Sequence, residues 1–327
     1  MTATVYAHLP GLRLESPSVP FADGQLIQLS FDDWMALESE FEYSADRYRK
    51  SAPVFWVGEM DGDPASPADN WSARVQDRLW PVHTALLLDI RAPLVPTPML
   101  SCCYVRLPGV SAVIESATAR LIGPMEREFI VYGSPLTHRY DAAALAAVEP
   151  WCRFLQTRDA ATLDPEALAG IGILEETARP DSWYRGDQEL SRRHGFIRCM
   201  AAVEQLLLPP EDERNAGELT QTFGQHAAML FGASRSDRDQ TAGYFSSLYR
   251  LRTELIHGRA AFDENADDVV RRFHSGRQLL GHAVKAALLT PDANPARQPL
   301  WDRLRANWAD PERAAVMKPL LEPGFPE

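Results

Sequence analysis

The hydrophobic pattern of the chain changes near residue 140, and this change limits the possible folds more than any other feature. Before it, β-branched and aromatic runs are divided by proline, glycine and polar turns, which is typical of strands. After it, apolar residues recur at the spacing of helix faces. The sequence therefore predicts an α+β fold, with a β-rich N-terminal domain over residues 1–138 and an all-α helical bundle over residues 139–290.

The first part of the chain is expected to hold several strands and one or two helices. A helix is predicted over residues 31–50, where Asp32 and Asp33 place negative charge near its start. The predicted strands cover residues 51–59, 82–90, 99–107, 111–123 and 127–133.

The second part predicts consecutive helices joined by short connections, which is the pattern of a bundle. Pro209 and Pro210 end one of these helices, because proline has no amide hydrogen to donate. Asn215 followed by Glu218 has the spacing of a capping box for the next helix. The predicted helices cover residues 141–158, 164–178, 188–208, 215–230, 236–257 and 265–289.

Residues 291–327 form a tail whose first part is rich in proline. A helix over residues 298–308 places Trp301, Leu304 and Trp308 on one face. We expect this helix to dock on the body of the protein, and binding of a partner is the alternative.

The composition is that of a globular chain, with 327 residues of which 45% are hydrophobic and 24% charged. No run approaches about 18 uncharged apolar residues, so no membrane-spanning helix is expected. No basic start precedes an apolar run, so no secretory signal is expected. The cysteines lack paired C-x-x-C spacing and indicate reduced thiols in the cytoplasm, without a zinc cage or a disulfide framework. They are Cys102, Cys103, Cys152 and Cys199.

Charge is unevenly distributed along the chain. Residues 1–184 hold 25 acidic and 14 basic residues, whereas residues 185–290 hold 14 of each. The acidic N-terminal half would repel a polyanion, which favours a protein or a small molecule as its partner. The neutral section can still carry a local basic patch.

An arginine followed five positions later by a histidine occurs three times, so this spacing does not identify a site by itself. One pair is divided by Pro81. Another lies in the middle of a predicted helix, where five residues turn through about 500° and leave the two side chains about 140° apart. The third is followed at once by Gly258, which can end a helix and free the histidine from regular helix geometry. In this order the pairs are Arg78/His83, Arg277/His282 and Arg252/His257.

Arg252 also lies on an apolar face of its predicted helix, with Phe245, Tyr249 and Ile256. A guanidinium on such a face needs an anion, hydrogen-bond acceptors or an interface, because an unpaired buried charge is costly. Two interpretations remain open. Arg252 is either a functional residue, or a structural one that pairs with a nearby carboxylate or reaches water with its head group.

His257 is expected near a helix C-terminus, where the helix dipole favours the protonated imidazole. Such a group suits acid–base chemistry near neutral pH, and simple capping of the last carbonyls is the alternative. The other helical histidines are expected at surface or half-buried positions: His194, His226, His274 and His282.

The region around the third pair resembles a known family. The segment LYRLRTELIHGRAAF (residues 248–262), with the helix before it and AAVEQLLL at residues 201–208, is similar to the Apea-like branch of the HEPN superfamily. The defining pattern of that superfamily is an arginine, four to six residues of any kind and a histidine, here Arg252 and His257. The resemblance covers about residues 185–290.

The resemblance implies a chemistry. HEPN domains of this type are commonly metal-independent endoribonucleases that act as dimers, with both copies of the motif facing one cleft. Arg252 would stabilise negative charge on the phosphorus centre, and His257 would move a proton. Arg250 and Arg259 would hold phosphates along the cleft, and solvated surface arginines are the alternative. No metal ion and no other cofactor is implied.

The segment departs from the family pattern at three points. Thr253 stands where many members have an amide, an acid or a histidine. Glu254 is a possible ion-pair partner for Arg252 or Arg259, which would weaken either residue as an anion ligand. No tyrosine stands two places after the histidine, which argues against the two-component arrangement that pairs with a nucleotidyltransferase.

Two functions are expected on these grounds. The first is a toxic, RNA-cleaving effector of antiviral defence or stress, expected as a cytoplasmic homodimer. Its acidic N-terminal domain would either sense a protein trigger or hold the nuclease in check. The second is a non-catalytic HEPN-like module for dimerisation or for RNA or protein binding, in which Arg252 is structural.

Overall fold

The structure of the protein is a computed structural model. The predicted strand over residues 127–133, and Asn265 as the start of a helix, lie outside the residues that it describes. The described residues are 2–9, 12–40, 54–61, 68–89, 102–107, 110–115, 138–158, 162–178, 188–215, 217–231, 235–259, 266–289 and 299–308.

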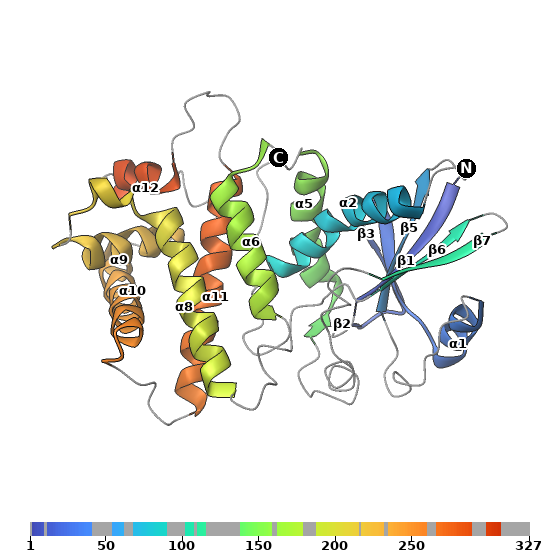
Figure 1. The fold of residues 1–327 in the computed structure, drawn as a ribbon, viewed down its shortest axis with the longest axis horizontal. Helices are drawn as coiled ribbons and strands as arrows, with labels where there is room; N and C mark the ends of the chain where they lie inside the picture. The colour runs from blue at the N-terminus through green and yellow to red at the C-terminus, as the bar shows by residue number, and fades with distance from the viewer. Residues whose placement is uncertain are drawn as a thin grey trace. The chain divides into compact units, whose positions relative to one another are not determined.

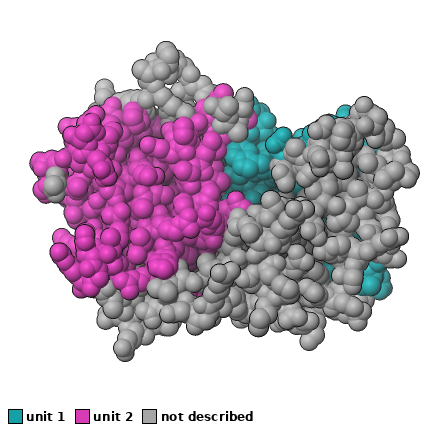
Figure 2. Space-filling view, in the orientation of Figure 1, with its two compact units in different colours: residues 1–87, 94–157, 178–184 teal, residues 88–93, 158–177, 185–327 magenta. Residues whose placement is uncertain are grey.

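The chain forms two compact units (Figure 2), and the fold is α+β with a mostly helical content. Because unit 1 extends to residue 157, a helix that the sequence assigns to the bundle belongs with the strands instead. Unit 1 contains residues 1–87, 94–157 and 178–184, and unit 2 contains residues 88–93, 158–177 and 185–327.

Unit 1 is built on an antiparallel sheet with the strand order β3-β4-β5-β1-β6-β7, in which β1 lies between β5 and β6 (Figure 1). Two further strands, β2 and β8, pair in parallel. The strands are β1 (Thr2–His8), β2 (Leu12–Leu14), β3 (Ser18–Phe21), β4 (Gly24–Gln28), β5 (Val54–Asp61), β6 (Cys102–Leu107), β7 (Val110–Glu115) and β8 (His138–Tyr140).

The core of unit 1 forms around β5, whose first residues are buried on both faces. Helix α1 (Phe31–Glu40) places Trp34 and Leu37 against Phe55 and Val57. The start of α1 is capped by Ser30, whose hydroxyl oxygen accepts the amide of Asp33 at 3.2 Å. Burial of these apolar side chains, two of which are aromatic, stabilises this unit.

Helix α2 (Ala68–Leu87) corrects one sequence prediction, because residues 82–87 are helical where a strand is expected. Leu79, Val82 and Leu86 are buried at helical spacing along it. A short apolar run fits a strand and a buried helix equally well. Pro81 just before this run favours a strand, because proline is disfavoured inside helices.

Helix α5 (Ala142–Gln156) packs against α2 within unit 1. Its start is fixed by Asp141, whose carboxylate accepts the amide of Ala144 at 2.6 Å. The predicted helix at this position is confirmed, although it belongs to unit 1.

Unit 2 is a helical assembly in which α8 packs on α11 and α9 packs on α10 (Figure 1). Each of the six helices predicted between residues 141 and 289, including the one in unit 1, corresponds to a helix in the structure. The helices of unit 2 are α6 (Pro165–Ala178), α8 (Gln188–Leu207), α9 (Leu219–Leu230), α10 (Arg235–Ile256), α11 (Ala266–Leu288) and α12 (Leu300–Trp308), with the 3-10 helix η2 (Glu211–Glu213).

The capping box predicted at Asn215 is wrong. Helix α9 begins at Leu219 with Glu218 at its N-cap position, and no side chain caps it. The side-chain oxygen of Asn215 instead accepts the amide of Gly217 at 3.2 Å. Asparagine favours such a local turn, which here delays the helix.

The short C-terminal helix α12 packs on α8 and α9. Leu304 is fully buried, and the guanidinium of Arg303 donates to the carbonyl of Ala286 at 3.1 Å. These contacts agree with the docking role expected for this helix. Among the described residues, no helix is both long and apolar enough to cross a membrane.

Candidate functional site

Helix α10 ends in a glycine motif that leaves the side chain of His257 exposed. Gly258 has a φ of 66°, in the left-handed region that favours glycine. Its amide donates to the carbonyl of Leu255 at 3.2 Å, and the amide of Arg259 donates to the carbonyl of Glu254 at 2.8 Å. These two hydrogen bonds form a Schellman motif, so the predicted end of this helix is confirmed. The expected release of His257 from helix geometry is not confirmed, because its amide still donates to the carbonyl of Thr253 at 3.2 Å, as in a regular helix.

Arg252 lies one turn before this end and is mostly buried, with its side chain 20% exposed. Its neighbours Phe245 and Tyr249 are buried, as the predicted apolar face requires. Ile256 corrects the prediction, because it is 48% exposed. The apolar face therefore stops at Arg252, and the last turn of the helix faces solvent.

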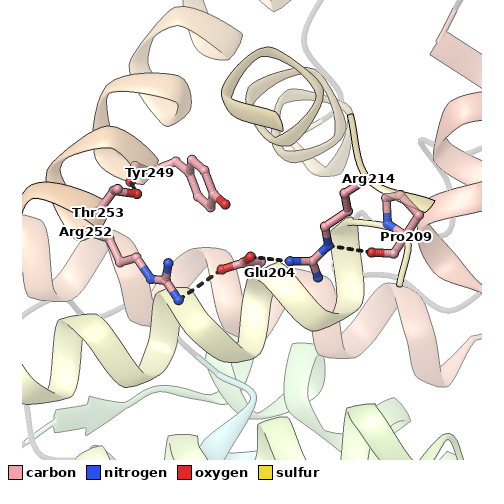
Figure 3. A network of polar contacts seen from close by, with 6 residues as sticks. All are labelled: Glu204, Pro209, Arg214, Tyr249, Arg252 and Thr253. Atoms are coloured by element: carbon pink, nitrogen blue, oxygen red, sulfur yellow. Dashed lines mark hydrogen bonds and ion pairs between the residues drawn. The ribbon is translucent and has the colours of Figure 1, made fainter. Parts of the chain in front are cut away.

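The ion-pair partner of Arg252 is Glu204, on helix α8 (Figure 3). The Arg252 Nη2 atom lies 3.0 Å from Glu204 Oε2. The sequence names Glu254 as a possible partner, but the carboxylate that the guanidinium meets comes from a different helix. Only the tertiary fold brings these two residues together, because they are 48 positions apart in the chain.

The second carboxylate oxygen of Glu204 forms an ion pair with another arginine, Arg214 (Figure 3). The Arg214 Nη1 atom lies 2.6 Å from Glu204 Oε1, and Arg214 Nε donates to the carbonyl of Pro209 at 2.7 Å. The side chains of Glu204 and Arg214 are only 11% and 15% exposed. One carboxylate is thus shared between two guanidinium groups, which leaves this trio with a net charge of +1.

Tyr249 completes the network on the side of Arg252. Its ring stacks on Phe223, with ring centroids 4.6 Å apart, and the Arg252 guanidinium carbon lies 6.0 Å from the Tyr249 ring centroid. Burial and the negative charge of Glu204 raise the pKa of Tyr249, and its hydrogen bond to that carboxylate acts in the same direction. Tyr249 is therefore neutral at pH 7.

The surroundings of the helix end are basic. The side chains of Arg250 and Arg259 are exposed. From helix α8, Arg193 Nη2 donates to the carbonyl of Leu255 at 3.1 Å and so places positive charge at the last turn of α10. Glu254 of the same turn has the opposite charge. An exposed imidazole on a helix end that carries more arginines than carboxylates can bind an anion and exchange a proton with it.

The structure brings Arg252 together with two residues that the sequence did not select, Glu204 and Arg214. A signal for Glu204 exists, because it is the single charged residue in the apolar run of residues 201–208. Arg214 has no such signal, since it follows three acidic residues in a polar connection. The side chain of Thr253 donates to the carbonyl of Tyr249 within its own helix at 3.1 Å (Figure 3).

The other two arginine–histidine pairs lie in different settings. Arg78 and His83 are both in helix α2, not before a strand. Arg277 is 6% exposed and donates to the carbonyl of Leu174, and His282 packs against Phe231 with ring centroids 4.6 Å apart. Neither of these pairs has its histidine at an exposed helix end.

Two of the remaining histidines correct the expectation of surface or half-buried positions. His226 is 3% exposed, and its Nδ1 atom lies 2.6 Å from the carbonyl oxygen of Leu207. His274 is 9% exposed, and burial, with a contribution from the charge of Arg277, lowers its pKa to about 4. Both imidazoles are buried inside unit 2.

Within the described part of the chain, no group of three or more histidine, cysteine, aspartate or glutamate residues is placed to hold a metal ion. Cys152 and Cys199 are free and buried. Burial raises the pKa of Cys199 to about 11 and that of Cys152 to about 12, so both thiols are protonated at pH 7.

Comparison with known proteins gives no relative. No protein-family model matches the chain, and neither a curated protein nor a solved structure matches it significantly.

Proposed function

We propose that the protein is a metal-independent endoribonuclease of the HEPN type, in which Arg252 and His257 act on an RNA phosphodiester. The observation that carries the proposal is the exposed His257 at the glycine-ended terminus of α10, five residues after an arginine whose position is fixed by Glu204. The resemblance of residues 185–290 to the Apea-like branch supplies the reaction type.

The chemistry follows from these two groups. The 2′-hydroxyl of a ribose attacks the adjacent phosphorus, the bond to the 5′ oxygen of the next nucleotide breaks, and the products are a 2′,3′-cyclic phosphate and a 5′-hydroxyl. His257 moves a proton from the attacking hydroxyl or to the leaving oxygen. Arg252 stabilises the additional negative charge on the phosphoryl oxygens.

The charge around the helix end supports RNA as the substrate. The trio of Glu204, Arg214 and Arg252 has a net charge of +1. The exposed Arg250 and Arg259 add two positive charges, and Glu254 in the same last turn removes one. Arginines at such positions bind phosphates irrespective of base sequence. Arg250 and Arg259 are therefore the proposed contacts with the RNA backbone.

A homodimer in the cytoplasm is part of the proposal. Ile256, next to His257, is 48% exposed, which suits a residue that meets a second copy. Unit 1, which holds most of the acidic excess, is proposed to receive a protein trigger for a defence or stress response. Replacement of Ile256 by aspartate is expected to shift the sedimentation coefficient from dimer to monomer, and an unchanged dimer would contradict this part.

The experiment that tests the proposal is incubation of the purified protein with mixed cellular RNA in EDTA. The parent protein is expected to cleave RNA, and the His257→Ala and Arg252→Ala variants are expected to lose cleavage. An RNA oligonucleotide that the parent protein cleaves should stay intact when its 2′-hydroxyls carry methyl groups, because the attacking hydroxyl is then blocked. Cleavage that EDTA abolishes, or that the His257→Ala variant retains, would contradict the proposal.

A second candidate is favoured by the ion pair between Arg252 and Glu204. In this alternative the helical unit is a non-catalytic module for dimerisation or binding, and Arg252 stabilises the contact of α10 with α8. The Arg252→Ala variant would then show a lower melting temperature or a weaker dimer, while the parent protein would cleave no RNA in any condition.

A further inference from the structure

The two carboxylate oxygens of Glu204 pair with two different arginines. This sharing determines how much net positive charge remains at Arg252. Oε2 faces Arg252 and Oε1 faces Arg214, at 3.0 and 2.6 Å. The shorter contact belongs to Arg214. Among these three mostly buried side chains, the arginine outside the proposed reaction centre therefore has the closer contact with the carboxylate.

The position of Arg214 is fixed by the chain around it. Pro209 and Pro210 follow the end of α8, and η2 turns the chain so that Arg214 returns to that end. There Arg214 Nε donates to the carbonyl of Pro209 at 2.7 Å while Nη1 meets Glu204. Two contacts on different atoms of the same guanidinium hold it in one orientation.

The electrostatic consequence is direct. With Arg214 in place, the two guanidinium groups and one carboxylate sum to +1, so the field outside the network stays positive. Without Arg214, the Glu204 carboxylate would neutralise Arg252 alone, and the sum would be zero. Because these groups are mostly withdrawn from solvent, water screens this difference less than it would at the surface.

We propose that Arg214 is a positioning residue, which holds Glu204 so that Arg252 keeps a net positive charge for an anionic phosphodiester. This inference rests on the proposed function, because it takes the anion at Arg252 to be an RNA phosphate. Arg214 acts through Glu204 and does not touch the reacting atoms.

The experiment measures binding and cleavage separately. Binding is measured by fluorescence anisotropy of a labelled 2′-O-methyl RNA oligonucleotide, which cannot be cleaved, at one fixed salt concentration. The full-length variants are Arg214→Gln, Glu204→Gln and the double variant with both changes. The matched control is Arg153→Gln, which removes the same charge from an exposed position in unit 1.

The double variant is the decisive one, because it restores the charge balance without restoring the contacts. The formal charge of the trio is +1 in the parent, 0 in Arg214→Gln, +2 in Glu204→Gln and again +1 in the double variant. We expect Arg214→Gln to weaken binding about tenfold. The double variant should return to within about threefold of the parent, and Arg153→Gln should bind like the parent.

Steady-state cleavage of unmodified RNA gives a second readout. Arg214→Gln should raise KM by a factor similar to its loss of affinity and should also lower kcat, because Arg252 is proposed both to bind the phosphate and to stabilise the charge that develops on it. Arg214→Lys keeps the charge and should retain most of the affinity. Melting temperatures of all variants report whether the fold is intact, and the rescue in the double variant is interpretable even if each single change lowers stability.

Three results would overturn the inference: parent-like binding by Arg214→Gln, a double variant as weak as Arg214→Gln, or a parent protein that does not bind the oligonucleotide. The second result would make Arg214 purely structural. Failure of the proposed function looks different, because the parent would then bind the oligonucleotide with the expected charge dependence and leave unmodified RNA intact.

Discussion

The same arginine–histidine spacing occurs on two neighbouring elements of unit 2 with opposite outcomes. On α10, Arg252 is held by Glu204 at the boundary of the core and His257 is exposed. On α11, Arg277 is buried against the carbonyl of Leu174, and His282 packs on an aromatic ring. In both pairs the histidine stands five positions after the arginine, with four residues between them.

The position of each pair along its helix explains the difference. Arg277 and His282 lie inside α11, where the helix continues beyond them and both side chains join the packing between helices. The pair on α10 lies at the end of a helix, where Gly258 turns the chain away and the histidine becomes accessible. A helix end, and not the spacing, separates a candidate site from a structural pair.

The largest expected effect is on RNA cleavage, and it should distinguish the two histidines. His257→Ala is expected to lower the rate constant in EDTA about a thousandfold, because the proton-transfer group is removed. His282→Ala should cleave within about threefold of the parent per folded molecule, because its imidazole contributes only to packing. Gel-based cleavage assays on both variants measure this contrast. Equal losses in the two variants would end the distinction between the pairs.

The next effect is the dependence of stability on pH, which should come from the buried imidazoles. Burial lowers the pKa of both His274 and His282 to about 4, while an unfolded histidine keeps its ordinary value near 6.5. Unfolding therefore takes up protons between these values. The contribution of these two histidines to the free energy of unfolding is fully present above about pH 6.5, and it is lost as the pH falls toward 4. His274 alone should account for about 3 kcal/mol over this window.

Urea denaturation at pH 7, 6, 5 and 4 measures this dependence. His274→Gln should show a shallower decline, with a slope smaller by up to about 1.4 kcal/mol per pH unit. An identical decline in His274→Gln and the parent would show that His274 is not the group responsible.

A smaller effect is expected on stability at neutral pH, where replacing His282 should cost more stability than replacing His257. His282→Ala removes a ring that contacts Phe231 and should lower the free energy of unfolding by about 2 kcal/mol. His257→Ala removes an exposed side chain and should change it by less than about 0.5 kcal/mol. Thermal and urea unfolding of both variants decide the point, and a larger loss in His257→Ala would contradict the structure of this region.

The smallest effect concerns two glycines on or next to α10. Gly258→Ala should cost about 1 kcal/mol, because alanine disfavours a φ of 66°. Gly243 lies within the helix, where an added methyl group would meet open space, so Gly243→Ala should stabilise the protein by about 0.5–1 kcal/mol. Urea unfolding measures both changes. The same sign in both variants would mean that Gly258 does not terminate the helix as described.

The sequence was sufficient for the local features of the site. Apolar spacing predicts α10, and Gly258 after His257 predicts where it ends, since both depend on residues close together in the chain. The strand predicted over residues 82–90 is wrong because a short apolar run does not distinguish a strand from a buried helix, and here the contacts within unit 1 decide.

The sequence pattern does not predict which residues of different helices meet. Glu204 approaches Arg252 only because α8 and α10 pack together, and Arg214 joins them only because the turn after Pro210 leads back to α8. The local pattern offers Glu254 as a possible partner for Arg252 or Arg259, because it is near both in the chain. The charge of the site therefore depends on residues that only the fold brings together.

The most direct test of the central claim is the chemistry of the RNA ends that the protein produces. Mass spectrometry of a short RNA of defined sequence, incubated with the protein in EDTA, identifies these ends. We expect 2′,3′-cyclic phosphates and 5′-hydroxyls with the parent and with His282→Ala, and none with His257→Ala. Products with 3′-hydroxyl and 5′-phosphate ends, or cyclic phosphates in equal amount from His257→Ala, would contradict the assignment of Arg252 and His257 as the reaction centre.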